Sequence, residues 1–111
     1  MPTIFEPKDL PATEKNGANV AMLANQVMLG TNALQVERIL LQPGAESASY
    51  HPSDVERFVY VIHGKGQAYV GEQVFPLSAE SVLWLEEDDT FYLEASSDGL
   101  EVLLCHAPAG E

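Results

Sequence analysis

The chain has little that could cross-link it or carry it into a membrane. Cys105 is the only cysteine in 111 residues, which excludes an internal disulfide and a zinc cluster built from several cysteines. No apolar run reaches the length of about 18 residues that a transmembrane helix needs. The first residues also lack the basic-then-apolar order of a secretory signal. We therefore expect a cytoplasmic protein with no membrane partner.

Basic residues are scarce as well. Five lysines and arginines stand against 17 aspartates and glutamates, which gives a formal net charge of −12. This charge repels phosphate backbones at long range, so nucleic acid is not an expected partner. Hydrophobic residues make up 46% of the chain, which is enough for one packed core. A domain of this size buries roughly 65% of its unfolded surface, and a homodimer is expected because pairing would add to that burial.

Short apolar runs separated by turn residues follow one another from Val20 onward. Glycines and aspartates, such as Gly64, Gly66 and the Asp98-Gly99 pair, separate the later runs and predict turns. With no helical pattern among the later runs, this spacing predicts an all-β sandwich or barrel. The runs are VAMLA, QVML, ALQVERILLQ, RFVYVIHG, GQAYVG, QVFPLS, SVLWLEE, TFYLEAS and LEVLLCH.

The chain divides into an N-terminal arm, residues 1–17, and a single barrel domain, residues 18–111. Three prolines among charged residues predict that the arm lies over the body of the domain, with one strand at Ile4 and Phe5. The stretch VAMLANQVML leaves two interpretations open. We favour a pair of strands, but its apolar residues also fit a helical period.

Residues 43–64, PGAESASYHPSDVERFVYVIHG, resemble the first conserved motif of the cupin superfamily. That motif has Pro-Gly, a His-x-His pair, a Glu, and an aromatic-aliphatic strand ending in Gly. On this match the two family histidines fall on His51 and Ser53, and the family glutamate falls on Arg57. The resemblance implies an all-β double-stranded β-helix, or jelly-roll, barrel that pairs into dimers.

The second cupin motif is matched in length by residues 80–95, but its landmark residues are replaced. In chain order, the residues that stand in place of Gly, Pro, Gly, His and Asn are Glu80, Glu86, Asp88, Phe91 and Ala95. One metal-ligand position of the family is therefore kept, and we predict no cofactor. A divalent zinc, iron, manganese or nickel ion is the alternative. The phrase ERFVYVI also resembles the non-metal half of bicupin ureidoglycine aminohydrolases.

Alternation along barrel strands predicts which side chains line the interior, because residues two apart share a face. If His51 points inward, Ser53 does too. On the next strand Arg57 and Val59 point inward, and Phe91 faces them from the other motif. We expect these residues to form a small-molecule pocket with a polar end and an apolar wall.

Arg57 and His51 carry the chemistry of this predicted pocket. A buried guanidinium needs a partner, because an unpaired buried charge is costly. One interpretation is an anionic ligand, such as a carboxylate, gripped by both arms of the guanidinium. The other is an ion pair with Glu56, Glu37 or another of the 17 acidic residues. His51 has a side chain that titrates near neutral pH, and it is the expected acid-base group of a metal-free site.

Three functions stay open at this point. The first is a barrel that binds a small anionic or polar molecule without a metal. The second is a metalloenzyme whose ligands are rearranged around His51, drawing on His63, His106 or Glu56. The third is a non-catalytic sensor or interaction module, for which the expected sign is an apolar surface patch or a filled barrel.

Overall fold

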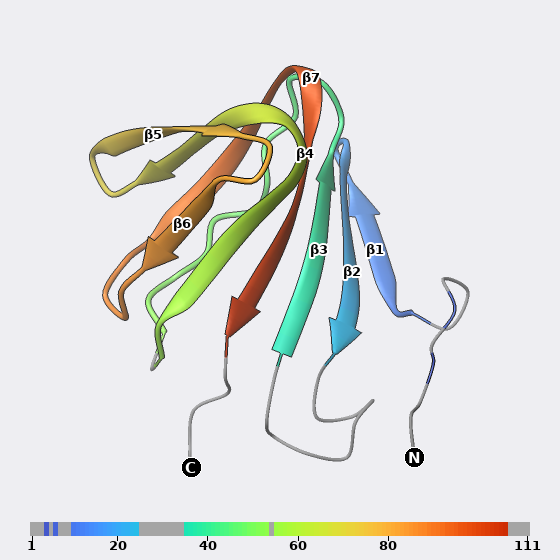
Figure 1. Ribbon diagram of the computed structural model, residues 1–111, viewed down its shortest axis with the longest axis horizontal. Helices are drawn as coiled ribbons and strands as arrows, with labels where there is room; N and C mark the ends of the chain where they lie inside the picture. The colour runs from blue at the N-terminus through green and yellow to red at the C-terminus, as the bar shows by residue number, and fades with distance from the viewer. Residues whose placement is uncertain (1–3, 5, 7–9, 25–34, 54, 107–111) are drawn as a thin grey trace.

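The computed structural model describes residues 4, 6, 10–24, 35–53 and 55–106. These residues form an all-β structure, which confirms the predicted fold class (Figure 1). None of them belongs to a helix long and apolar enough to cross a membrane. The strands are β1 Ala12–Lys15, β2 Ala18–Ala24, β3 Gln35–Leu41, β4 Arg57–Val70, β5 Gln73–Ser78, β6 Val82–Leu85 and β7 Phe91–His106.

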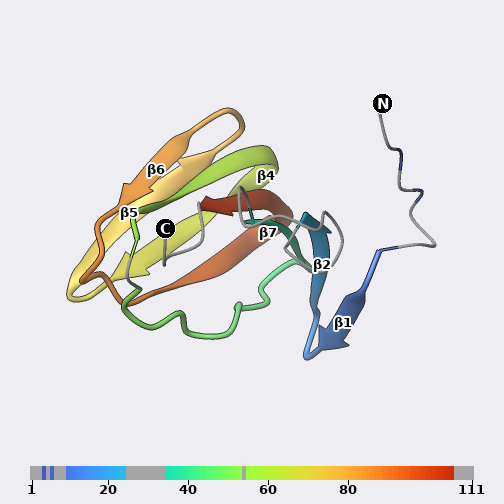
Figure 2. The ribbon, with the colours of Figure 1, turned by 90° about the horizontal axis from the view of Figure 1, so that it is seen from below.

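The strands form one antiparallel sheet that curls around an interior. Their order is β1-β2-β3-β7-β4-β5, and β6 pairs with β4. The second half of β7 pairs with both β3 and the first half of β4, whereas the first half of β7 pairs with the second half of β4. The segment between β3 and β4 adds bridges from Glu46 to Glu94 and from Tyr50 to Phe91. Seen from below, the strands and this segment surround the interior (Figure 2).

Two strands are twice as long as the sequence predicts. The turns expected at Gly64 to Gly66 and at Asp98-Gly99 lie inside β4 and β7, which both curve where they pass from one wall to the other (Figure 1). The register shifts near Gly64 and Gly66, as in β-bulges. A Cβ at Gly64 would lie 2.2 Å from the Gly99 carbonyl oxygen. The turn prediction is therefore wrong here, because these glycines allow two backbones to approach closely.

The N-terminal arm ends in an edge strand. Asn16 has a φ of 54° and Gly17 a φ of 85°, as in the two-residue type I′ turn that joins β1 to β2. Ile4 is 86% exposed and is not in a strand, so it does not pack on the body as predicted, and Phe5 lies outside the described residues. VAMLA lies within β2, as the strand interpretation requires, while QVML is not among the described residues.

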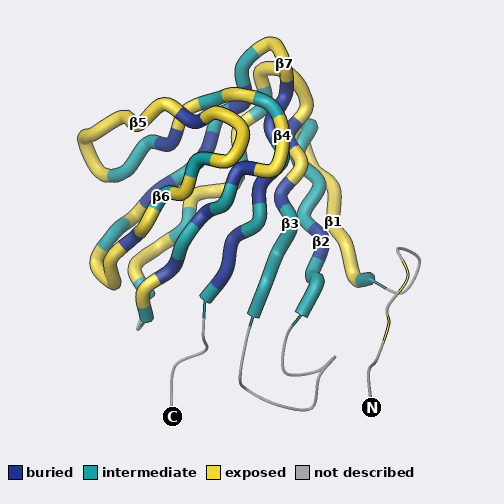
Figure 3. Tube along the Cα trace, viewed as in Figure 1, coloured by how far each residue is buried: buried dark blue, intermediate teal, exposed yellow. Residues whose placement is uncertain are grey.

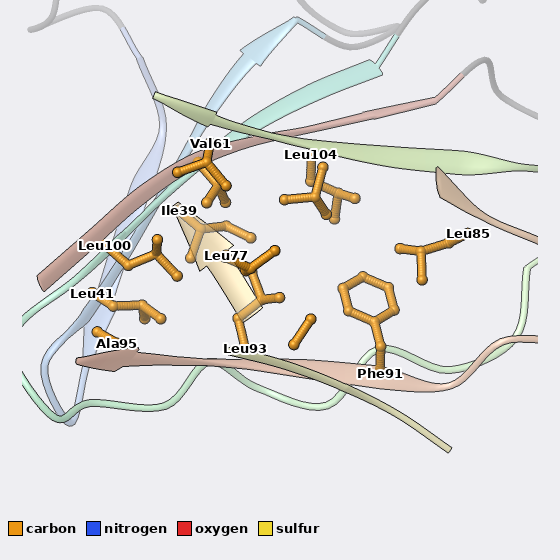
Figure 4. Packing of buried hydrophobic residues seen from close by; sticks show 13 residues of the cluster. Ile39, Leu41, Val61, Leu77, Leu85, Phe91, Leu93, Ala95, Leu100 and Leu104 are labelled. Carbon is orange, nitrogen blue, oxygen red and sulfur yellow. The ribbon is translucent and has the colours of Figure 1, made fainter. Parts of the chain in front are cut away.

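The interior is filled by apolar side chains. Buried and more exposed positions alternate along much of β4 and β7, as expected for strands with one face inward (Figure 3). Side chains from both walls meet in Figure 4, and each large one adds about 1.5–3 kcal/mol when fully buried. The cluster comprises Ile39, Leu41, Val59, Val61, Ala68, Leu77, Leu85, Phe91, Leu93, Ala95, Leu100, Val102 and Leu104.

Candidate functional site

Arg57 is the one buried charged side chain among the described residues, with 5% of its surface exposed. It begins β4 and shares the inward face of that strand with Val59. One terminal nitrogen, Nη1, donates to the His51 carbonyl at 3.0 Å. The other, Nη2, donates to the Asp89 carbonyl at 2.9 Å. The guanidinium therefore joins the loop before β4 to the turn between β6 and β7.

Among the described residues, no acidic side chain hydrogen-bonds to Arg57, as the ion-pair interpretation would require. Within the described part of the chain its hydrogen bonds end on backbone carbonyls, and its guanidinium carbon lies 5.2 Å from the centre of the Phe91 ring. Burial lowers the pKa of Arg57, and the nearby Asp89 carboxylate partly offsets this. The Nε–H is buried and has no partner in the described structure. One donor of the guanidinium is thus left unsatisfied.

His51 does not point inward with Arg57 as predicted. Its imidazole is exposed, and its contact with Arg57 is made by its carbonyl. The alternation rule fails because residues 51–53 are not in a strand. The inward side chain is instead Tyr50, whose ring stacks on Phe91 with centroids 4.9 Å apart. Ser53 is half-buried, and its hydroxyl oxygen accepts the Val55 N–H at 3.2 Å.

Val59 and Phe91 lie in the interior but are closely packed there. Their exposed fractions are 0% and 1%, so in this conformation neither side chain offers surface to a ligand. The predicted apolar wall is thus part of the filled core. A hollow of about 940 Å³ lies elsewhere, beside Lys65, Pro76 and Glu94. None of the five predicted site residues lines that hollow.

Glu37 and His106 share the inward face with Arg57 at the same end of the barrel. His106 is the register partner of Arg57 on β4, and Glu37 is opposite Leu104, two residues before His106. Burial raises the pKa of Glu37, and the charge of nearby His106 partly offsets it. Burial and the Glu37 carboxylate together raise the pKa of Tyr50 to about 12. We call Glu37, Tyr50, Arg57 and His106 the polar end of the barrel.

The sequence suggested Glu37 only as an ion-pair partner of Arg57 and His106 only as a ligand of a rearranged metal site. Tyr50 was not predicted to belong to the site. The signal for the first two was present, because Glu37 and Ile39 are two apart on β3, as Leu104 and His106 are on β7. No comparable signal marked Tyr50, which lies in an irregular segment. His63 is exposed and lies within β4, apart from this end. Cys105, beside His106 in the chain, is buried, and burial raises the pKa of its thiol.

The chain resembles known proteins more strongly in fold than in sequence. The chain matches no protein-family model. It is 28% identical over 88 residues to a protein named polyketide synthase CurC from Streptomyces cyaneus. The match covers 78% of this chain and 56% of that protein, so the chain spans just over half the length of this relative.

Solved structures resemble the whole barrel. An RmlC-like cupin from Shewanella frigidimarina superposes with a TM-score of 0.77 at 17% identity, covering 100% of this chain and 95% of its own. The chain has the cupin fold. A predicted oxalate decarboxylase from Thermotoga maritima gives a TM-score of 0.81 at 15% identity, covering 96% and 100%. The Streptomyces nucleoside dehydratase Pac13 gives 0.78 at 16% identity, covering 100% and 86%.

The residues at the metal position of the cupin motifs do not fit a metal ion. His51 has an exposed side chain, and the other positions hold Ser53, Arg57 and Phe91. A guanidinium opposes a cation, and a phenyl ring has no donor atom for one. The described residues contain no group of three or more His, Cys, Asp or Glu side chains that could hold a metal. The polar end offers hydrogen-bonding groups from Tyr50 and Arg57 and a carboxyl group, Glu37, whose pKa is raised.

Proposed function

We propose that this cupin barrel binds a small polar molecule, with a carboxylate or carbonyl group, at its polar end and without a metal. One observation carries the proposal: the buried Nε–H of Arg57 has no acceptor in the described structure. Buried donors are nearly always satisfied in native proteins, and an unmade bond costs about 1–3 kcal/mol. A ligand oxygen would supply the acceptor.

The rest of the polar end suits the same ligand. Tyr50 keeps its hydroxyl proton over the whole physiological range because its pKa is about 12, so it can donate a hydrogen bond. Glu37 has a raised pKa, which lets it hold a proton beside an anion or exchange one with the ligand. His51 is exposed and can reach a ligand only from outside, so we assign the acid-base role to Glu37 instead.

The named relatives guide the choice of probes. One carries polyketide synthase in its name, and another is a nucleoside dehydratase solved with uridine. Polyketide intermediates are rich in carbonyl groups, and uridine has carbonyl and hydroxyl groups. Acetate, malonate, acetoacetate and uridine therefore form the first panel.

Isothermal titration of this panel tests the proposal, with the wild type compared to Arg57→Lys and Glu37→Gln. Lysine keeps the positive charge of Arg57 but has no guanidinium, so it lacks the Nε–H donor. We expect binding of a carboxylate or carbonyl probe to weaken about tenfold or more in Arg57→Lys, since one charge-assisted bond is worth about 1.5–3 kcal/mol. Circular dichroism confirms that each variant is folded.

Lys65→Gln provides the control, because Lys65 borders the separate hollow beside Glu94. It should leave the affinity unchanged. If wild type and Arg57→Lys bind a probe equally and Lys65→Gln binds it more weakly, the ligand binds in that hollow and not at the polar end. If no probe binds the wild type, the proposed ligand class is wrong.

A second candidate function is a non-catalytic interaction module. It is favoured by Val82 and Trp84, which are 60% and 58% exposed on β6. In that case Arg57 serves only to hold the two loops together, and Arg57→Lys lowers stability without changing any binding.

A further inference from the structure

The barrel is not closed by strand pairing between β5 and β6. Both strands pair with β4, β6 along residues 57–60 and β5 along residues 65–70. In the part of the chain that the structure describes, no pairing joins the two strands to each other. Figure 1 and Figure 2 both show them on the same side of the barrel, away from β1 and β2. The interior can therefore be reached on this side.

A hollow of about 350 Å³ lies at this unpaired side. Its volume is within the range of small-molecule sites. We call it the side hollow, and its lining residues are Val70, Gln73, Phe75, Leu83, Trp84, Leu85, Glu86 and Asp89. None of the four residues of the polar end lines it. The side hollow is thus separate from the site proposed above.

Much of the apolar lining of the side hollow comes from the inward faces of the strands. Phe75 is the register partner of Ala68, and Leu83 is the register partner of Val59; both partners are fully buried. Phe75 nevertheless leaves 36% of its surface exposed. Val70 and Leu83 pack on the core but are only partly buried. These core-facing side chains leave apolar surface that a ligand can cover.

The charged residues that line the side hollow are both acidic. They are Glu86 and Asp89, and no lysine or arginine lines it. The Asp89 carboxylate is held in the turn, because its Oδ2 accepts the Glu86 N–H at 2.8 Å. Glu87 and Asp88 lie between these two residues in the chain, whose net charge is −12. The rim therefore repels an anion and attracts a cation.

We propose that the side hollow binds an organic cation, an ammonium ion that carries an aromatic or branched alkyl group. The apolar group covers Phe75 and Leu83, and the ammonium lies at the rim. Arg57 is close to Asp89 and offsets its charge, so we assign the ammonium to Glu86. About a dozen non-hydrogen atoms fill a hollow of this size, if each takes roughly the 30 Å³ of a water molecule in the liquid.

Calorimetric titration with ligands of similar size and different charge tests the class of ligand. The probes are 2-phenylethylammonium, neutral 2-phenylethanol and anionic 3-phenylpropionate. We expect 2-phenylethylammonium to bind most tightly, and added salt to weaken its binding but not that of 2-phenylethanol. Methylammonium, which lacks the apolar group, should not bind. Equal or tighter binding of 2-phenylethanol overturns the proposal, as does the absence of saturable 2-phenylethylammonium binding at millimolar concentration.

Glu86→Gln and Glu87→Gln are matched variants that test the rim. Each removes one negative charge from the same turn, but only Glu86 lines the side hollow. Glu86→Gln should weaken 2-phenylethylammonium binding about two- to fivefold, as expected for the loss of one partly exposed ion pair, and leave 2-phenylethanol binding unchanged. Glu87→Gln should bind both probes like the wild type. Equal weakening in the two variants would show attraction to net charge and overturn the site.

Gln73→Trp and Val74→Trp test the location. These neighbours lie on β5, and Gln73 lines the side hollow whereas Val74 does not. The indole of Gln73→Trp should fill the hollow and weaken binding more than tenfold, while Val74→Trp should bind normally; circular dichroism checks that both are folded. In the wild type, Trp84 is the only tryptophan and lines the hollow, so its emission should change as the site saturates. Binding that leaves Trp84 emission unchanged, or that persists in folded Gln73→Trp, overturns the proposal.

Discussion

Glu80 holds a backbone conformation that side chains other than glycine rarely adopt. Its φ is 71°, and its N–H donates to the Val61 carbonyl at 2.8 Å. The cupin motif has glycine at this position, and a left-handed residue with a Cβ costs about 1–2 kcal/mol. We expect Glu80→Gly to raise the free energy of unfolding by about 0.5–1 kcal/mol, the gain being reduced by the greater freedom of glycine in the unfolded chain.

Urea unfolding measures this gain, and Glu80→Ala is its control. Alanine removes the same charge but keeps the Cβ, so this variant should not be stabilised in the same way. An equal gain in both variants would assign the effect to charge instead of backbone strain.

Glu37 should make the protein less stable as the pH rises. Burial raises its pKa in the folded state, despite the opposing effect of His106. The folded state therefore binds more protons than the unfolded state between the two pKa values, and the free energy of unfolding falls across that window. The contribution is fully present below the unfolded pKa, about 4.3, and is lost as pH passes the folded pKa.

Glu37→Gln checks this titration by urea unfolding at several pH values. The wild type and the variant should have similar pH dependence except between these two pKa values, where the wild type loses stability and Glu37→Gln does not. The same variant should lower the pKa of Tyr50, because it removes a nearby negative charge. A variant whose pH profile is parallel to that of the wild type throughout would show that Glu37 is not desolvated.

At the residue scale, alternation was enough to place some side chains but not others. Arg57 and Val59 lie in β4, where period two holds, and both are interior. His51 is outside any strand, so the same rule pointed it the wrong way. The partners of Arg57 could not be predicted, because they are backbone carbonyls of two loops brought together only by the complete barrel.

The curvature of β4 depends on a glycine that tolerates no side chain. A Cβ at Gly66 would lie 2.1 Å from the Glu94 carbonyl oxygen of β7, although Gly66 has no positive φ. Gly71 is the reverse case, with a φ of 59° and open space around it. We expect Gly66→Ala to cost roughly 3 kcal/mol or more, as overpacking of backbone does. Gly71→Ala should cost about 1 kcal/mol, from conformation alone.

Urea unfolding of both variants separates close approach from backbone conformation. If Gly66→Ala costs no more than Gly71→Ala, the two strands can move apart and the close contact is not essential. This pair of glycines also explains why the sequence misplaced the ends of β4. A glycine in a turn and a glycine at a close backbone contact look the same in a sequence, and only the neighbouring strand distinguishes them.

At the scale of the whole molecule, strand rhythm and turn residues were enough to predict an all-β sandwich or barrel, and the resemblance of residues 43–64 to the first cupin motif specified the cupin barrel. Local patterns were enough to place individual strands of the described sheet, such as β5, whose bounds match QVFPLS, but not to join the runs that form β4 and β7. Whether the barrel is filled or open could not be predicted from the sequence, because this depends on how the side chains of β3, β4 and β7 pack against one another. The polar end likewise depends on register between strands far apart in the chain.

The charge of the whole chain should make its stability rise with salt. A net charge of −12 repels itself in the compact state, and salt screens this repulsion as the Debye length falls from about 30 Å at 0.01 M to about 8 Å at 0.15 M. We expect the melting temperature to rise by several degrees over this range of NaCl, at about 4–8 °C per kcal/mol for a domain of this size. Protein concentration is held fixed, because any self-association would make the melting temperature depend on concentration.

Glu72→Lys tests whether net charge is the cause. Glu72 is exposed in the turn between β4 and β5, and this change lowers the negative charge by two. The variant should melt higher than the wild type at low salt and gain less from added NaCl. A melting temperature that falls with NaCl would mean that favourable ion pairs outweigh the repulsion among the 17 acidic residues.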